Sequence, residues 1–173
     1  MRRLLALLGI GALALVGLLG WANLHHPALP PKTKVDKVLL LKSDRSLVLL
    51  DEGKVVASYP VSLGARPVGP KQREGDGRTP EGRYIIDYHN RASSFFKSLH
   101  VSYPSGADRA RAQREGVSPG GMIMIHGLPP RFAWLGRLHL FADWTDGCIA
   151  LTNQQVQQVF DAVADGTPIE IQP

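Results

Sequence analysis

Short apolar runs, each bounded by turn-forming residues, divide most of this chain. Ser43, Asp44 and Arg45 separate the first two runs, which we expect to pair as a β-hairpin. The runs expected to form strands cover residues 38–41, 47–50, 55–63, 83–88, 99–103 and 122–125. Many short strands at close spacing predict a mainly β domain, either a β-sandwich or a partly closed barrel.

One helix is predicted near the C-terminus. Thr152 and Gln155 form a capping box, in which each side chain bonds a free backbone amide of the first turn. Four apolar residues then share one helical face at the spacing i, i+3, i+4, i+7: Val156, Val159, Phe160 and Val163. Gly166 ends the helix, and residues 168–171 are expected to form a last strand. Residues 64–82, which hold five glycines and three prolines, are predicted to be a long loop.

The N-terminus has the pattern of an export signal. Arg2 and Arg3 precede an unbroken apolar run over residues 4–22, as in a secretory signal peptide. The run also reaches the roughly 20 residues that a helix needs to span a bilayer. Residues 1–22 are therefore expected to be either a signal peptide or an N-terminal membrane anchor. The two arginines predict a cytoplasmic N-terminus and a domain in the periplasm or cell envelope.

The rest of the chain is predicted to be a short tether followed by one folded domain. Residues 23–34 contain three prolines and two histidines, His25 and His26, and we interpret them as an extended, solvated tether. Residues 35–173 are long enough for one domain with a substantial core and too short for two.

The charge balance disfavours nucleic acid as a partner. The net charge is +5, and without Arg2 and Arg3 the chain keeps 18 basic against 15 acidic residues. This mild basic bias suits an anionic polymer such as a cell wall. However, no stripe of basic residues with interleaved aromatic residues is present, and no glycine-rich phosphate loop precedes a helix.

Cys148 is the only cysteine, so an exported chain cannot use it in an internal disulfide. Such a thiol is either a small buried apolar group or is retained for its reactivity. Cys148 follows the polar turn 144–147, whose Gly147 would allow a substrate backbone to approach closely. A thiol held at a turn between rigid elements is exposed at a fixed point, which favours a nucleophile.

A reactive thiol needs a base, because the thiolate is the attacking species. His126 follows the apolar run 122–125 and precedes Gly127, so a buried strand would hold its ring beside a turn. A core histidine would have the same sequence context, but we assign the base to His126. The other histidines are expected in the tether (His25, His26), on the surface (His89), at the core or rim (His100) and in a lid or on the surface (His139). As candidate metal ligands, His100, His126, His139 and Cys148 lack the paired spacing of a zinc site, so neither a metal nor a cofactor is expected.

These residues resemble the L,D-transpeptidase (YkuD-like) catalytic domain, in particular its Gram-negative periplasmic branch. The resemblance rests on Ile125-His126-Gly127 and, after a long spacer, on Thr145-Asp146-Gly147-Cys148-Ile149. Residues 79–84 and 99–104 are also similar to segments of the family. The resemblance covers residues 35–173 and implies a mainly β catalytic domain with one helix in its C-terminal region and a lid segment.

The resemblance also implies a mechanism. His126, oriented by the backbone carbonyl of Gly127, would take the proton of Cys148. The thiolate would attack a peptidoglycan stem tetrapeptide after its third residue and expel D-alanine, which leaves a thioester. The backbone amides of Gly147 and Cys148 would stabilise the oxyanion, with Thr145 supporting the turn. An amine-bearing acceptor peptide or protein would then release the thioester as a crosslink or an anchored protein.

Two positions depart from the family pattern. Many members carry histidine where Asp146 stands, and arginine or asparagine where Ala150 stands. Asp146 cannot donate a proton as an imidazolium would, so we expect it to cap the turn locally. Between the two catalytic positions, four large apolar residues are expected either to line a lid over the donor or to be ordinary core: Trp134, Leu135, Leu138 and Phe141.

Two other functions remain open from the sequence. With water as the acceptor, the same chemistry would make an L,D-carboxypeptidase or a hydrolase of the same bonds. A non-catalytic peptidoglycan-binding module would instead use the basic loop residues Arg66, Lys71, Arg73 and Arg78. The inner membrane is a further expected partner if residues 1–22 are retained.

Overall fold

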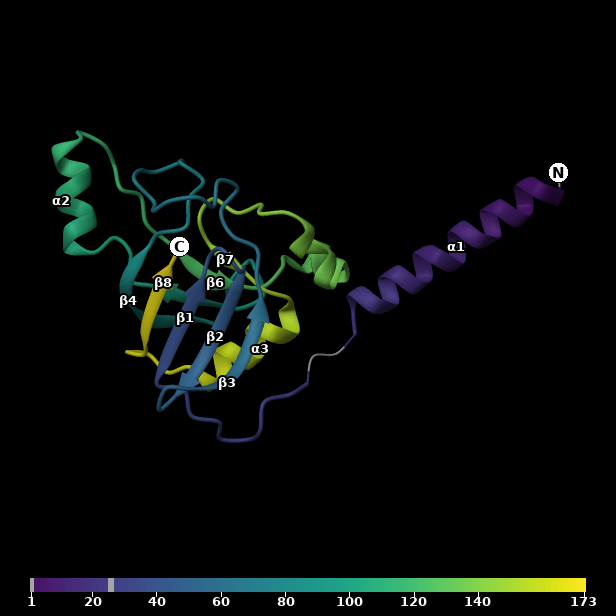
Figure 1. The fold of residues 1–173 in the computed structure, drawn as a ribbon, viewed down its shortest axis with the longest axis horizontal. Coiled ribbons are helices and arrows are strands. Elements are labelled where there is room, and N and C mark those ends of the chain that lie inside the picture. Colours follow the sequence, from purple (N-terminus) through teal and green to yellow (C-terminus); the bar gives the residue numbers. More distant parts are fainter. Residues whose placement is uncertain (1, 25–26) are drawn as a thin grey trace.

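An eight-stranded sheet forms the body of the molecule, and a long N-terminal helix extends away from it (Figure 1). The computed structural model describes residues 2–24 and 27–173, with side chains from residue 9 onward. His25 and His26, which we expected in a solvated tether, lie outside the described residues.

The strands run in the order β3-β2-β1-β8-β4-β5-β6-β7 across the sheet. Along the chain they are β1 (Lys37–Leu41), β2 (Ser46–Asp51), β3 (Lys54–Pro60), β4 (Gly82–Asn90), β5 (Ser98–Val101), β6 (Met124–His126), β7 (Ile149–Ala150) and β8 (Pro168–Gln172). Two pairs are parallel, β1 with β8 and β6 with β7, and the other pairs are antiparallel. The prediction of a mainly β domain is confirmed, and each run expected to form a strand overlaps one of these elements.

The two edges of the sheet curl toward each other. Ser62, which follows β3 at one edge, and Ala150 of β7 at the other edge exchange backbone hydrogen bonds of 3.0 and 2.8 Å. A second bridge joins Gly64 to Thr145. Closure of a sheet onto itself satisfies edge groups that would otherwise stay unpaired. Of the two predicted architectures, the partly closed barrel is therefore the one observed.

The β1–β2 hairpin shows how the apolar pattern builds the core. Val38 pairs with Leu49 and Leu40 pairs with Leu47, and all four side chains are fully buried. Because side chains alternate between the faces of a strand, this register places the four on the same inner face. Each such side chain contributes roughly 1.5–3 kcal/mol through its removal from water.

The predicted C-terminal helix is present as α3 (Asn153–Ala162). Thr152 accepts a hydrogen bond from the backbone N–H of Gln155 at 3.3 Å, and the Gln155 side chain accepts from the backbone N–H of Thr152 at 3.2 Å, so the capping box is confirmed. Val156, Val159 and Phe160 are buried in the core cluster, as their spacing predicted.

Three further helical segments are present: α1 (Arg2–Ala22), α2 (Gly106–Arg114) and the 3₁₀ segment η1 (Pro130–Phe141). Ser105 caps α2 in a capping box with Asp108. η1 consists of two short helices that meet at a kink at Gly136, where φ is 47°. The C-terminal end of α1 lies against η1, where the Asn23 side chain donates to the carbonyl of Trp134 at 3.0 Å. Among the described helices, none combines the length and the apolar character needed to cross a membrane.

Candidate active site

Cys148 lies at the end of a tight turn that leads into β7. The Thr145 hydroxyl organises this turn, because it donates to the carbonyl of Cys148 at 2.7 Å and accepts from the backbone N–H of Gly147 at 3.1 Å. Gly147 has a φ of +126°, and a Cβ at this position would lie 2.5 Å from the carbonyl oxygen of Arg78. Only glycine fits the turn without displacing the neighbouring backbone.

His126 is the last residue of β6 and shares a sheet face with Cys148. In the parallel pairing of β6 with β7, His126 is opposite Ala150. Residues two apart in an extended chain point to the same face, so Cys148 lies on the face that carries His126. Both side chains line one cavity of about 290 Å³, as the assigned nucleophile and base require.

The His126 imidazole is held in one orientation and is uncharged at neutral pH. Its Nδ1 lies 2.7 Å from the carbonyl oxygen of Gly127, which places the ring proton on Nδ1 and leaves Nε2 as an acceptor. The side chain is buried, and this burial lowers the pKa of His126, although the bond to Gly127 acts in the opposite direction. A neutral imidazole with a free Nε2 can accept a proton.

The Cys148 thiol is protonated at rest. Burial raises its pKa, and the negative charge of Asp146 raises it further. Two contributions oppose this shift: a hydrogen bond from the backbone N–H of Met124 to Sγ, at 3.4 Å, and the positive charge of Lys71. The resting pair is therefore a neutral thiol and a neutral imidazole.

Two aromatic rings, Phe95 and Trp144, pack against the His126 ring and stack on each other, with their centroids 6.4 Å apart. The Phe95 ring centroid lies 4.5 Å from that of His126, and the Trp144 centroid lies 5.8 Å away in an edge-on arrangement. Both aromatic side chains also line the cavity. Neither residue is predicted from the sequence as part of the site. No local pattern marks Phe95, and Trp144 stands out only as the first residue of the turn before Cys148.

Of the two positions expected for His139, in a lid or on the surface, the surface is wrong, and the residue lies in η1, the segment expected to be a lid. This residue is only 6% exposed, and its Nδ1 lies 3.2 Å from the hydroxyl of Ser62 and 3.4 Å from Nε1 of Trp144. Burial, with a smaller effect of nearby His126, lowers the pKa of His139 to about 4. The segment η1 packs against Ser62, which follows β3. His139 is therefore buried, and its ring contacts the side chain of Trp144.

Residues of the expected lid form a second apolar cavity beside the first. Leu135, Leu138 and Phe141 line a space of about 470 Å³ that shares Phe95 and Trp144 with the Cys148 cavity. None of the three belongs to the main core cluster, and Phe141 is 78% exposed. The alternative that these residues are ordinary core is therefore wrong. Trp134, which we grouped with them, is exposed and does not line this cavity.

The capping role expected of Asp146 belongs to Thr145. Asp146 is exposed and lines the cavity mouth, where its charge acts on the thiol. The Thr145 hydroxyl makes the turn hydrogen bonds instead, because Thr145 lies two residues before the N–H of Gly147. Since that N–H is already bonded, Gly147 can stabilise an oxyanion only by releasing Thr145.

The other predicted candidates lie away from the thiol. His89 Nδ1 is 2.5 Å from Asp165, and His100 Nδ1 is 2.6 Å from Asp87. Within the described parts of the chain, no three histidine, cysteine or acidic side chains come together as a metal site. Lys71, one of the basic loop residues of the binding-module alternative, is 3% exposed and cannot contact a polymer.

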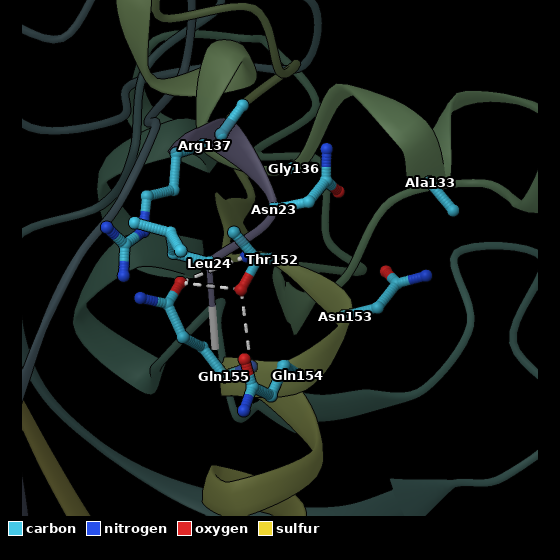
Figure 2. A pocket seen from close by; sticks show the side chains of 10 residues that line it. Asn23, Leu24, Ala133, Gly136, Arg137, Thr152, Asn153, Gln154 and Gln155 are labelled. Atoms are coloured by element: carbon cyan, nitrogen blue, oxygen red, sulfur yellow. Dashed lines mark hydrogen bonds between the residues drawn. The ribbon is translucent and has the colours of Figure 1, made fainter. Parts of the chain in front are cut away.

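A third cavity, of about 320 Å³, lies between the end of α1, η1 and the start of α3 (Figure 2). Asn23, Arg137 and Thr152 are among its lining residues, and all ten lining residues lack a thiol or an imidazole. The Thr152 hydroxyl is engaged in the α3 capping box, and the lining residues also lack a carboxylate, so we place the candidate active site at Cys148.

The curled, mainly β sheet described above is the fold of L,D-transpeptidase catalytic domains. Comparison with protein families matches residues 35–171 to the YkuD family, the L,D-transpeptidase catalytic domain. The chain belongs to this family, and the resemblance found in the sequence is confirmed.

Relatives agree with this assignment. YafK of Escherichia coli K12, a proposed L,D-transpeptidase, is 27% identical over 176 residues, which cover 92% of this chain and 62% of YafK. The chain thus spans less than two thirds of that relative.

Solved structures show the same fold. The helical cell shape determining protein Pgp2 of Campylobacter jejuni is 25% identical with a TM-score of 0.62, covering 90% of this chain and 54% of Pgp2. Bd1075 of Bdellovibrio bacteriovorus is 22% identical with a TM-score of 0.55, over 87% of this chain and 52% of Bd1075, and supports the fold alone.

Proposed function

We propose that this chain is a cysteine-dependent L,D-transpeptidase that acts on peptidoglycan stem tetrapeptides. The observation that carries the proposal is the shared cavity of Cys148 and His126, reached from neighbouring strands on one sheet face. Membership in the L,D-transpeptidase family supports the substrate class.

The reaction begins with an uncharged pair. As Cys148 Sγ attacks the carbonyl carbon after the third residue of the stem peptide, His126 Nε2 takes the thiol proton. The tetrahedral intermediate collapses, the C–N bond to D-alanine breaks, and His126 returns the proton to the leaving amine. The product of this half-reaction is a thioester between Cys148 and the donor peptide.

Neighbouring groups support these steps. The Gly127 carbonyl accepts a hydrogen bond from the Nδ1–H of His126, and this bond stabilises the imidazolium that forms during the reaction. The backbone N–H of Cys148 has no acceptor among the described residues, so it is the first donor for the oxyanion. The N–H of Gly147 joins it when the Thr145 hydroxyl turns away.

The second half-reaction depends on the acceptor. An amine on a second peptide or on a protein attacks the thioester carbonyl and gives its proton to His126. The C–S bond then breaks, His126 returns the proton to Cys148, and the product is a crosslink or an anchored protein. Water in the same position would make the chain an L,D-carboxypeptidase or a crosslink hydrolase. The name of Pgp2 connects that relative to cell shape, and we extend to this chain a role in cell wall biogenesis.

The proposed location is the periplasm or cell envelope. Residues 1–22 act as a signal peptide or an inner-membrane anchor, residues 23–34 as a tether, and residues 35–173 as the catalytic domain. Fractionation of cells that express the full chain, with mass spectrometry of its N-terminus, tests this assignment. Recovery in the cytoplasm with an intact N-terminus would contradict it.

Replacement of the two central residues tests the mechanism. Cys148→Ala, Cys148→Ser and His126→Ala should each abolish thioester formation with a carbapenem and turnover of purified sacculi, since each removes the nucleophile or its base. Intact-protein mass spectrometry and muropeptide analysis measure the two effects. His100→Ala, outside the cavity, is the matched control and should keep activity.

Two outcomes contradict the mechanism. Acylation at full rate in His126→Ala would show that His126 is not the base. Binding of sacculi without labelling, and without any effect of Cys148→Ala, would instead indicate a non-catalytic module.

A further inference from the structure

A continuous set of contacts leads from the closed edge of the barrel to the ring of His126. Ser62 and Ala150 exchange the backbone hydrogen bonds that close the sheet. The Ser62 hydroxyl donates to the backbone carbonyl of His139 at 2.9 Å and lies 3.2 Å from its Nδ1. His139 contacts Trp144, and the Trp144 ring packs edge-on against His126. Since Ala150 is also the residue opposite His126 in the β6–β7 register, the five residues form a closed ring of contacts.

The bond between Trp144 and His139 fixes the tautomer of His139. An indole nitrogen can only donate, so Nε1 of Trp144 donates to Nδ1 of His139 at 3.4 Å. Nδ1 is then unprotonated, and the ring proton of the neutral imidazole lies on Nε2. The two ring planes meet at 88°, with their centroids 6.4 Å apart. His139 therefore holds the indole by the edge that carries its N–H.

The buried imidazole of His139 leaves one polar atom unpaired. Its side chain is 6% exposed, and its Nε2 has no hydrogen-bond partner among the residues that the structure describes. An unpaired buried N–H is destabilising, and an apolar side chain between Leu138 and Leu140 would avoid it. The bond from Ser62 goes to the backbone carbonyl, which any residue provides. The interaction that requires a side-chain acceptor at this position is therefore the bond from the Trp144 N–H.

Trp144 and Phe95 form the wall against which the His126 ring packs. The planes of the two aromatic rings lie 24° apart, and both rings line the Cys148 cavity and the second apolar cavity. The hydrogen bond from His126 Nδ1 to the Gly127 carbonyl fixes one edge of the imidazole. A single hydrogen bond leaves the ring free to tilt about it, so packing against the wall sets the plane of the ring.

We propose that His139 and Trp144 are positioning residues for the base. His139 fixes the rotamer of the Trp144 indole, and the indole fixes the plane of the His126 ring, with Nε2 turned into the cavity of Cys148. Trp144 is 36% exposed, so core packing alone does not hold its side chain. The proposal rests on the catalytic role of His126 proposed above.

Three substitutions separate positioning from general stabilisation. His139→Leu keeps a side chain of similar size and removes the acceptor for the Trp144 N–H. His139→Asn places an amide oxygen near the position of Nδ1 and should keep the bond. His89→Leu is the matched control, because His89 also packs edge-on against an aromatic ring, that of Phe160, with centroids 4.5 Å apart, and lines neither cavity.

The NMR signals of the His126 imidazole report the orientation of the ring without any peptidoglycan substrate. In ¹H–¹⁵N spectra of the full chain, these signals are assigned by their loss in His126→Ala. The wild type and His139→Asn should give one set, with the proton on Nδ1. His139→Leu should split or broaden the set and slow the acylation of Cys148 by a carbapenem about tenfold, since a small misplacement of a catalytic group slows a reaction. His89→Leu should change neither measurement.

Four results overturn the proposal: unchanged His126 signals in folded His139→Leu, split signals with an unchanged acylation rate, an equal disturbance in His89→Leu, or no recovery in His139→Asn. If His139→Leu does not fold, Trp144→Phe keeps an aromatic ring, removes the N–H donor and should disturb the His126 signals in the same way; unchanged signals there also overturn the proposal. The expected changes in the spectra, combined with no acylation and no turnover of sacculi by the wild-type chain, would contradict the transpeptidase function and leave the positioning of the His126 ring intact.

Discussion

At the scale of single residues, Cys148 and His126 are both uncharged in the resting site. Burial raises the pKa of Cys148 and lowers that of His126, so both members of the pair are neutral at rest. In the proposed mechanism, the transfer of one proton creates the reactive thiolate only as the carbonyl carbon is attacked. His139 supports the His126 ring indirectly, because it contacts Trp144, and Trp144 packs against His126.

His139 predicts an acid sensitivity of the fold. Its pKa is lowered from 6.5 to about 4 in the folded protein, so the unfolded chain takes up a proton at a higher pH than the folded one does. The contribution of His139 to the free energy of unfolding is therefore fully present above about pH 6.5 and is lost as the pH falls toward 4. This contribution is on the order of 1–3 kcal/mol. His139→Asn should flatten this decline.

Urea unfolding at pH 7 and pH 4.5 measures the effect. The free energy of unfolding should fall more between these two pH values in the wild type than in His139→Asn. An identical fall in both proteins would show that the buried imidazole of His139 does not titrate as inferred. The variant's overall stability can be lower at both pH values without affecting this comparison.

At the scale of elements, the nucleophile turn is the most constrained segment of the chain. It has loop 64–82 on one side and the β6–β7 pair on the other. Thr145 satisfies the polar backbone groups of the turn, while Gly147 allows the close approach of the Arg78 carbonyl. The geometry of the thiol thus depends on three segments that are distant in the sequence.

Gly147→Ala should be strongly destabilising, and Gly166→Ala should be mild. Both glycines have positive φ, +126° and +89°, which costs about 1 kcal/mol for alanine. At Gly147 the new Cβ would also meet backbone at 2.5 Å, whereas nothing lies within 4 Å at Gly166. We expect a loss of roughly 2–4 kcal/mol for Gly147→Ala, together with slower carbapenem acylation of Cys148.

Chemical unfolding and acylation kinetics of the two variants provide the measurement. Equal losses of stability would mean that only the backbone conformation matters. In that case the Arg78 carbonyl would not be the close neighbour that the structure places there.

At the scale of the whole molecule, the folded domain and α1 are nearly separate. The core cluster draws its buried members from residues 38–171, and only Leu29 and Val35 before β1 pack against it, among the residues described before Lys37. The contact of α1 with η1 is confined to the end of the helix, as Figure 1 shows. The stability of the domain should therefore depend little on α1.

A chain that begins at Pro27 should keep the fold and melt within about 5 °C of the full chain, since the described residues before Pro27 contribute one hydrogen bond and a small contact to the domain. A chain that begins at Asp36 should melt at a distinctly lower temperature, because it also lacks Leu29 and Val35. Thermal unfolding followed by circular dichroism distinguishes the two. Loss of cooperative melting in the Pro27 variant would contradict the separation of α1 from the domain.

Much of this molecule could be predicted from local patterns. The strands followed from apolar runs between turn residues, and α3 from its capping box and helical spacing. The patterns His126-Gly127 and Gly147-Cys148 singled out two residues that line one cavity, and their catalytic roles stay a proposal. The capping role of Asp146 and the surface position of His139 were predicted incorrectly. In both cases a contact between neighbouring groups determined the outcome: the Thr145 hydroxyl makes the turn hydrogen bonds, and the Ser62 hydroxyl lies 3.2 Å from Nδ1 of the buried His139.

The elements and the candidate nucleophile turn could be predicted from the sequence because caps, turns and side-chain periodicity act within a few residues. The closure of the barrel, the support of His126 by Trp144 and His139, and the packing of loop 64–82 against Gly147 depended on the tertiary structure. Each needs segments that are far apart along the chain, such as Ser62 and His139, which are 77 positions apart. Packing of the whole core brings such segments together, and no local pattern encodes the distance between them.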